Sequence, residues 1–236
     1  MLPEQRQYWS SIKELYPEIS IPVAVGSPNA GDDIQSLIAA RFFKCSNFIE
    51  RDNKDGYINN RHIVLLCGYY QIPNQFNNGN ILFAGTYIYP PIKDKINWTL
   101  MRSLSEEQLM PFGARDLSTL QILKDNGIER CVWSGCVSQL IEKEFIPFKK
   151  TRKYAINVVN IPNGFEIRSN SFVHLKEYTI DQRLRLAQEL LDEYKLADKI
   201  ITSRLHIYLP LKEMGINIEL QLDENVRLQD RFKGFI

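Results

Sequence analysis

The sequence lacks the patterns that mark several common classes of protein. Its cysteines, at positions 45, 67, 131 and 136, form no CxxC pair and have no histidine at ligand spacing. Neither a zinc site nor a thioredoxin-like motif is therefore predicted. No apolar run approaches the roughly 18 residues that a membrane-spanning helix needs. Residues 1–8 are polar and charged, so we expect no secretion signal and favour a reducing cytoplasm.

An excess of charge of one sign is also missing. The chain has 29 Lys and Arg against 28 Asp and Glu in 236 residues, a net charge of +1, which argues against a general nucleic-acid binder. The length suffices for one large domain or two small ones. One basic cluster stands out, Lys149, Lys150, Arg152 and Lys153. We interpret it as a connector at a domain boundary, with docking of an acidic lipid head group or a phosphorylated substrate as the alternative.

What is present is an alternation of short apolar runs with helical patterns. A partly helical leader, residues 1–18, has Tyr8, Trp9, Ile12 and Leu15 at a spacing that covers an apolar surface. This alternation is typical of parallel sheets with helices on their faces. We therefore predict an α/β fold with two small Rossmann-type lobes and mostly parallel sheets, residues 1–150 and a shorter second lobe, 151–236. Strands are expected at residues 21–25, 62–67, 80–84, 128–133, 154–159, 172–175, 199–202 and 216–222, and helices at 34–43, 117–126, 179–194 and 207–214.

The polar segment 71–79 is predicted to be a loop between two strands. Thr179 and Asp181 are predicted to cap an amphipathic helix. Its charged residues, Arg183, Arg185, Glu189 and Glu193, are assigned to an exposed face.

The loop after the first strand, residues 26–33, is rich in turn formers. Gly31 would let the backbone approach a ligand, and Asp32 or Asp33 would cap the following helix. The loop matches neither a Walker A nor a dinucleotide fingerprint. Two interpretations stay open, a capped helix start and a ligand site.

Arg115 stands at a second junction between a strand and a helix, with Asp116 and Ser118 at the helix start. A helix N-terminus and a guanidinium both suit an anion, so this junction is a candidate anion site. The alternative is that Asp116 simply pairs with Arg115.

A third junction combines an anion site with a proton-transfer group. The strand 199–202 ends in Ser203-Arg-Leu-His206. Ligands of doubly wound folds bind beyond the carboxyl ends of the strands, where Arg204 would clamp an anion and His206 would transfer a proton. A surface ion pair and a structural histidine are the alternative. Because Arg115 and Arg204 occupy equivalent junctions, a shared anion pocket is predicted.

In their order, these segments resemble the polysaccharide pyruvyl transferase family. The likeness spans about residues 22–225 and rests on four motifs: Asn29-Ala-Gly-Asp32, Ala114-Arg-Asp-Leu-Ser118, Ala197-Asp-Lys-Ile-Ile-Thr-Ser-Arg-Leu-His206 and Gly215-Ile-Asn-Ile218. The resemblance implies a GT-B-like pair of lobes. It also implies transfer of the enolpyruvyl unit of phosphoenolpyruvate onto two hydroxyls of a sugar, giving a pyruvate ketal.

The resemblance also assigns roles. His206 and Arg204 would be catalytic, with His206 as the general acid that protonates the developing methyl carbon or assists phosphate loss. Arg115 and Arg204 would hold the carboxylate and the phosphate of phosphoenolpyruvate, one each. Substrate binding would also involve Asp116, Ser118, Gly31, Asp32 and Ser203. The scheme requires no metal and no cofactor other than phosphoenolpyruvate as donor.

The implied acceptor is a sugar of a cell-surface polysaccharide or a lipid-linked glycan precursor. The implied location is the cytoplasm, including the inner face of the membrane. Two other functions remain open. One is a GT-B glycosyltransferase, in which Arg204 holds the diphosphate of a nucleotide sugar. The other is a non-catalytic sugar- or partner-binding relic of the fold. Binding of phosphoenolpyruvate, of a nucleotide sugar or of neither separates the three.

Overall fold

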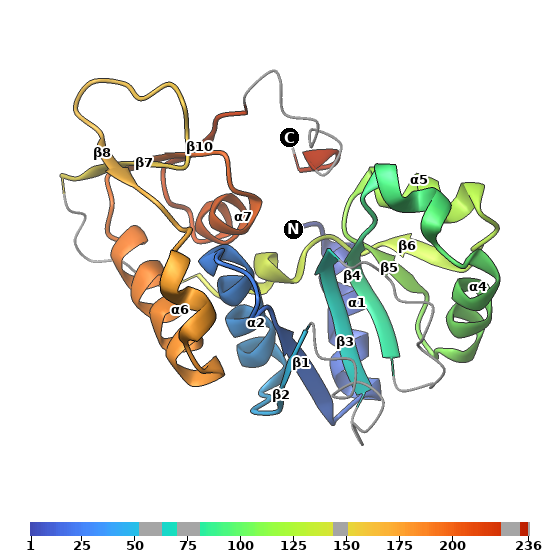
Figure 1. Cartoon of the computed structure of the whole chain (residues 1–236). Coiled ribbons are helices and arrows are strands. Elements are labelled where there is room, and N and C mark those ends of the chain that lie inside the picture. The colour runs from blue at the N-terminus through green and yellow to red at the C-terminus, as the bar shows by residue number, and fades with distance from the viewer. Residues whose placement is uncertain (52–62, 70–80, 144–150, 223–231, 236) are drawn as a thin grey trace. The chain divides into compact units, whose positions relative to one another are not determined.

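The computed structural model describes residues 1–51, 63–69, 81–143, 151–222 and 232–235. The chain forms two compact units, neither of which is continuous in sequence (Figure 1). The first comprises Met1–Pro22, Phe43–Val137 and Leu228–Ile236, and the second Val23–Phe42 and Ser138–Arg227. The sequence predicts a single division after residue 150. In the observed grouping the second unit instead takes residues 23–42 and begins again at Ser138, and the chain from Leu228 belongs to the first unit.

A six-stranded sheet forms the centre of the first unit, in the order β2-β1-β3-β4-β5-β6. The pairings whose register is described, from β1 to β6, are all parallel. All seven residues of β4 are buried, as expected of a central strand covered on both faces. The strands are β1 (Ile19–Val23), β2 (Phe48–Glu50), β3 (Ile63–Tyr69), β4 (Ile81–Tyr87), β5 (Phe112–Ala114) and β6 (Cys131–Trp133).

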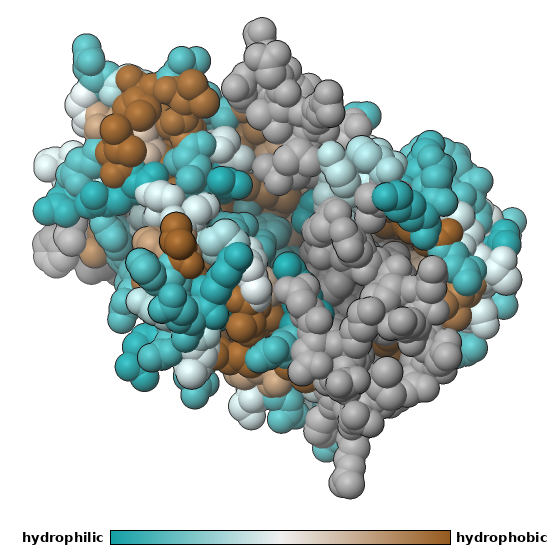
Figure 2. Space-filling model, viewed as in Figure 1, coloured by the Kyte–Doolittle hydropathy of each residue, from teal (hydrophilic) through white to brown (hydrophobic). Residues whose placement is uncertain are grey.

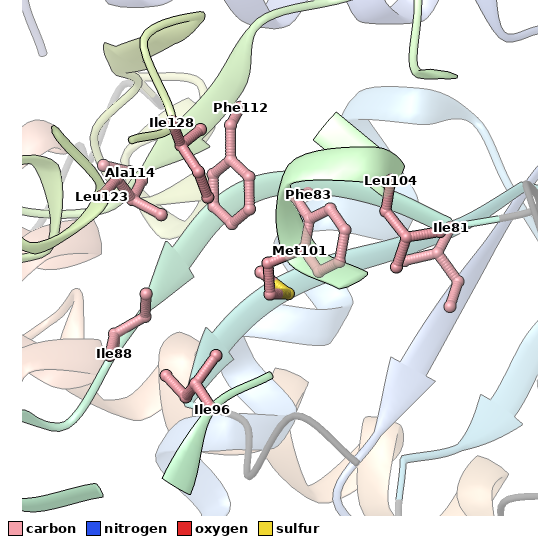
Figure 3. Close-up of a cluster of buried hydrophobic side chains, with 10 residues drawn as sticks. All are labelled: Ile81, Phe83, Ile88, Ile96, Met101, Leu104, Phe112, Ala114, Leu123 and Ile128. Carbon is pink, nitrogen blue, oxygen red and sulfur yellow. The ribbon is translucent and has the colours of Figure 1, made fainter. Parts of the chain in front are cut away.

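Helices α4 (Trp98–Glu107) and α5 (Leu117–Asp125) pack against this sheet around one hydrophobic cluster (Figure 3). Phe83 of β4 and Phe112 of β5 stack with their ring centroids 4.6 Å apart. Met101 and Leu104 of α4 and Leu123 of α5 complete the cluster. Each helix therefore packs an apolar face against the sheet, which stabilises these short helices, whereas Leu117 at the start of α5 is exposed. The 3₁₀ helices η1 (Pro90–Lys95) and η2 (Val137–Leu140) lie in the connections.

The leader forms α1 (Pro3–Leu15), as its spacing predicts. Tyr8, Trp9 and Ile12 are buried, and the Trp9 indole donates a hydrogen bond of 2.8 Å to the carbonyl of Ser134. Leu15 is 48% exposed, so its predicted place on the apolar face is wrong. It is the last residue of the helix.

The second unit has a four-stranded sheet in the order β10-β9-β7-β8, with all three pairings parallel. Its strands are β7 (Lys153–Ile156), β8 (Glu166–Arg168), β9 (Lys199–Thr202) and β10 (Ile218–Leu220). Its helices are α2 (Ala30–Phe43), α6 (Ile180–Tyr194) and α7 (Leu205–Glu213). Thr179 is the N-cap of α6, as predicted, but its partner in the capping box is Gln182 and not Asp181.

Residues 172–175, predicted as a strand, belong instead to the 3₁₀ helix η3 (Val173–Glu177) and its N-cap, Phe172. Val173 is 82% exposed and Leu175 is buried, so the segment lacks the burial pattern of a strand inside a sheet. The strand that pairs with β7 is β8, which the sequence analysis missed because its residues Glu166, Ile167 and Arg168 are largely exposed.

Both units are therefore Rossmann-like, and the predicted α/β class with mostly parallel sheets is confirmed. The GT-B arrangement stays a prediction. The segment 71–79 and the basic residues Lys149 and Lys150 lie outside the described residues. Within those described, the helices are all too short or too polar to cross a bilayer. Figure 2 shows hydrophobic residues at the surface near β7 and β8, where Val159 and Ile167 are 77% and 68% exposed.

Candidate functional site

The site begins at the loop that enters α2, where Asn29 immediately precedes the helix. Its side-chain oxygen accepts a hydrogen bond of 3.1 Å from the N–H of Gly31, the second helical residue, which is the arrangement of an N-cap. The prediction that Asp32 or Asp33 caps this helix is wrong, because α2 starts at Ala30, earlier than its apolar pattern indicates. This frees both carboxylates for other contacts.

Asp32 contacts His206, 174 positions later in the chain. The Nδ1 atom of His206 lies 3.3 Å from Oδ1 of Asp32. The same oxygen accepts a hydrogen bond from the Asn29 amide at 3.1 Å, and Oδ2 accepts one from the Ser27 hydroxyl at 3.2 Å. The Asn29–Asp32 motif and the Ser203–His206 motif therefore form one site within the second unit.

Asp33, the next residue, forms a fully buried ion pair with Arg183 of α6. The two nitrogens Nε and Nη2 donate to the two carboxylate oxygens at 3.0 Å each. The guanidinium also donates to the carbonyls of residues 24, 25, 27 and 175. Arg183 is 0% exposed, so its predicted place on an exposed helix face is wrong. Because it binds the loop carbonyls and Asp33 together, Arg183 fixes the path of the chain into α2.

The carboxyl end of β9 leads directly into α7 through Ser203 and Arg204. Arg204 is the N-cap residue and its side chain does not cap the helix. The first N–H groups of a helix lack partners within it, and the dipole places positive charge there. Among the described residues, the buried Nε of Arg204 has no hydrogen-bond partner. An anion at this helix start would meet both a guanidinium and a helix N-terminus.

Two asparagines that the sequence analysis did not single out tie these loops together. Asn157 follows β7 with φ of +53°, a left-handed conformation that asparagine tolerates better than most residues. Its backbone carbonyl accepts the hydroxyl of Ser203, and its side-chain oxygen accepts the N–H of Asn170 at 3.0 Å. Asn170, 0% exposed, donates from its amide to Asn29 at 2.9 Å. The position of Asn157 directly after the largely buried strand β7 is a local sequence signal for such a role, whereas Asn170 follows the largely exposed β8.

Gly31 lies in the middle of these contacts. A Cβ at this position would lie 3.1 Å from side-chain atoms of both Asn29 and Asn170 and 3.4 Å from Cβ of His206. The absence of a side chain at Gly31 therefore lets protein side chains pack closely against its backbone. Its role in binding a substrate stays a prediction.

The second predicted anion site lies in the first unit. Arg115 follows β5 and is 3% exposed, with its guanidinium carbon 4.2 Å from the ring centroid of Tyr87. Its Nε lies 3.6 Å from Oδ2 of Asp116, which is too long for a hydrogen bond. Asp116 is the N-cap of α5 and accepts the N–H of Thr119 at 2.8 Å. Burial raises the pKa of Asp116, against the opposing effects of Arg115 and Thr119.

The predicted residues thus fall into two groups. Gly31, Asp32, Ser203, Arg204 and His206 gather in the second unit. Arg115, Asp116 and the half-buried Ser118 belong to the first. A pocket shared by Arg115 and Arg204 stays a prediction. Within the described residues, His, Cys, Asp and Glu side chains form no group of three that would hold a metal ion.

Comparison with known proteins gives one family and one fold. Residues 29–207 match the family model described as "Polysaccharide pyruvyl transferase". The match begins at Asn29 and ends directly after His206, so it includes both motifs of the second-unit site. Comparison with curated proteins gives no match. Among solved structures, the chain is similar to an uncharacterised protein from Klebsiella pneumoniae subsp. pneumoniae NTUH-K2044, with a TM-score of 0.63, 11% identity, and coverage of 98% of this chain and 94% of that one. At this identity the likeness concerns the fold alone.

Proposed function

Because the chain belongs to the polysaccharide pyruvyl transferase family, we propose that it transfers the enolpyruvyl group of phosphoenolpyruvate onto two hydroxyls of a sugar. The product is a pyruvate ketal on a cell-surface polysaccharide or on its lipid-linked precursor. In this proposal the reaction takes place in the cytoplasm or at the inner face of the membrane.

The proposed reaction needs one acid and two anion contacts. C3 of phosphoenolpyruvate gains a proton and becomes a methyl group, while C2 forms two C–O bonds to the sugar oxygens. The C2–O bond to phosphate breaks. Of the two hydroxyl protons, one balances the proton taken up by C3 and the other leaves with the phosphate. General acid catalysis of such a step is typically worth about 10²–10⁴-fold in rate.

The observation that carries the proposal is the contact between His206 and Asp32 beside Arg204. A histidine held by a carboxylate is suited to donate and recover a proton near neutral pH. In our proposal His206 is the general acid, and Arg204 holds one anionic group of the donor at the start of α7. The buried Nε of Arg204, which has no hydrogen-bond partner among the described residues, supports this role.

Arg115 takes the other anionic group of the donor in this scheme. Its support is the buried guanidinium that no carboxylate of the described residues binds in a two-pronged fashion. Ser118 and Ser203 contribute hydroxyls to substrate binding. The scheme uses no metal and no further cofactor.

The test is calorimetric titration of the purified protein with phosphoenolpyruvate, with UDP-sugars as the comparison. We expect phosphoenolpyruvate to bind and Arg204→Ala to weaken binding at least tenfold, because charge-assisted hydrogen bonds are worth about 1.5–3 kcal/mol. Arg185→Ala, which removes an exposed arginine of α6, is the matched control and should not change the affinity.

Turnover is then measured as release of inorganic phosphate in the presence of glycan acceptors. His206→Ala should lower the rate by about 10²-fold or more while phosphoenolpyruvate still binds. Binding of a UDP-sugar in place of phosphoenolpyruvate would move the chain to the glycosyltransferases. Binding of neither would favour a non-catalytic relic of the fold.

A further inference from the structure

The hydrogen bonds around Asp32 fix the orientation of the amides that contact it. The N–H of Gly31 can only donate, so the atom of Asn29 that it meets is the oxygen. The Asn29 nitrogen must then face Asp32, which accepts from it at 3.1 Å. Asn170 meets the same Asn29 oxygen at 2.9 Å and must therefore also present its nitrogen. The chain of donors runs from Asn170 through Asn29 to Asp32.

The backbone holds the far end of this chain in place. The N–H of Asn170 donates to the Asn157 side chain at 3.0 Å, and its carbonyl accepts the N–H of Ala30 at 2.8 Å. On the other side, the Ser27 hydroxyl binds Oδ2 of Asp32 at 3.2 Å. The carboxylate of Asp32 is thus oriented by donors on both oxygens, which stabilises its ionised form.

An ionised carboxylate can only accept, so the Nδ1 atom that lies 3.3 Å from Asp32 carries the proton. Proton exchange with a substrate therefore falls to the other ring nitrogen, Nε2. His206 is also the second residue of α7, where the positive end of the helix dipole disfavours a positively charged ring. The negative charge of Asp32 opposes that effect and favours the protonated ring that a general acid needs.

We propose that Asp32 is a positioning residue that fixes the Nδ1–H tautomer of His206 and stabilises its protonated form, with Ser27, Asn29 and Asn170 orienting the carboxylate. The catalytic meaning of this assignment rests on the proposed function. The tautomer itself does not, because it is a property of the protein without substrate.

Substitution of Asp32 by Asn removes one negative charge near His206 and leaves the other charged side chains in place. Arg204 is two residues away on the same loop, and Arg183 is neutralised by its buried pair with Asp33. A comparison of the native chain with Asp32→Asn therefore isolates the effect of the Asp32 charge. Asp181→Asn is the matched control, since Asp181 is also an acidic residue in the first turn of a helix but is exposed.

The experiment is ¹⁵N NMR of the imidazole rings, followed as a function of pH. The chain has three histidines, so assignment requires only His206→Gln, and the 81% exposed His174 is an internal reference. In the native protein we expect the neutral ring of His206 to be protonated at Nδ1. In Asp32→Asn we expect the Nε2–H tautomer to become populated and the titration midpoint of His206 to fall by about one pH unit, through loss of a neighbouring opposite charge. Asp181→Asn should change neither.

An Nε2–H tautomer in the native protein would overturn the proposal, and this measurement needs no variant. So would an unchanged tautomer and midpoint in folded Asp32→Asn. If phosphoenolpyruvate does not bind but the Nδ1–H tautomer depends on Asp32, the proposed function fails and the positioning role stands. Where turnover is measured, Asp32→Asn should lower kcat by about 10²-fold or more and shift its pH profile, with little change in donor affinity.

Discussion

At the scale of single residues, Arg115 and Asp116 form an ion pair without a hydrogen bond between Nε and Oδ2. Both are buried, yet their nearest charged atoms are 3.6 Å apart. One oxygen of Asp116 caps α5, and the other, Oδ2, has no hydrogen-bond partner among the described residues. A buried charge without full compensation costs stability. An arrangement of this kind is typical of functional sites, where stability is given up for binding.

The raised pKa of Asp116 leads to a prediction about pH. Burial, its main cause, means that the folded state binds the proton of Asp116 more tightly than the unfolded state does. The stabilising effect of that proton is fully present below the unfolded pKa, near 3.8, and is lost as pH rises through the higher folded pKa. Asp116→Asn should therefore gain stability relative to the native chain as pH rises from about 4 to 7.

Urea unfolding of both proteins at several pH values measures this difference. Asn retains the oxygen that accepts the N–H of Thr119, so the helix cap is preserved. Asp125→Asn, at the exposed end of the same helix, is the control. A stability difference that stays constant or reverses with pH would contradict the raised pKa.

At the scale of elements, α6 is the helix that fixes the entrance to α2. Its Arg183 binds Asp33 in the first turn of α2 and the loop carbonyls before it. Figure 1 shows α2 and α6 side by side in the second unit, consistent with this contact. Because Asp32 precedes Asp33 directly, the ion pair also determines where the carboxylate that meets His206 can lie.

Arg183→Met tests the contribution of this ion pair. The substitution keeps the aliphatic part of the side chain but leaves Asp33 buried without its counter-charge. We expect a loss of about 3–5 kcal/mol in the free energy of unfolding. Arg185→Met, two residues further along α6 and exposed, should change it by less than about 0.5 kcal/mol. Urea unfolding measures both, and a cost below about 1 kcal/mol for Arg183→Met would show that the ion pair does not hold the loop.

At the scale of the whole molecule, the last described residues, 232–235, belong to the first unit although they follow the second unit in the sequence. Phe232 is 0% exposed, and the carbonyl of Lys233 accepts the N–H of Leu117 at 3.2 Å. Gly234 has φ of +96°, and a Cβ there would lie 2.5 Å from the Trp133 ring. The backbone therefore approaches the indole more closely than any other residue type allows.

Phe232→Ala tests whether this segment stabilises the first unit specifically. Removal of a buried phenylalanine side chain typically costs about 3–5 kcal/mol. Hydrogen exchange should show faster exchange for residues 81–137 and little change for residues 153–222. Val173→Ala, at an 82% exposed position, is the control and should leave both regions unchanged. Equal acceleration of both regions would indicate that the segment does not act on the first unit alone.

The elements that depend on local pattern could be predicted from the amino-acid sequence. The strand at residues 199–202, the helix after Thr179 and the stop at Gly215, where φ is +79°, lie where periodicity and capping predict them. The family resemblance was likewise present in the motifs and is confirmed by the match over residues 29–207. The parallel arrangement of the strands in both sheets was predicted from the alternation of strands and helices along the chain.

The contacts between distant polar side chains, in contrast, follow from the folded arrangement of the chain. Arg183 has the helical position and charge of an exposed residue, yet it is buried because a carboxylate 150 positions away neutralises it. Asp32 and His206 are 174 positions apart, and Asn157 and Asn170 join their loops. Local propensity concerns neighbours within a few residues, whereas the free energy of a buried hydrogen bond or ion pair depends on partners that the fold brings together.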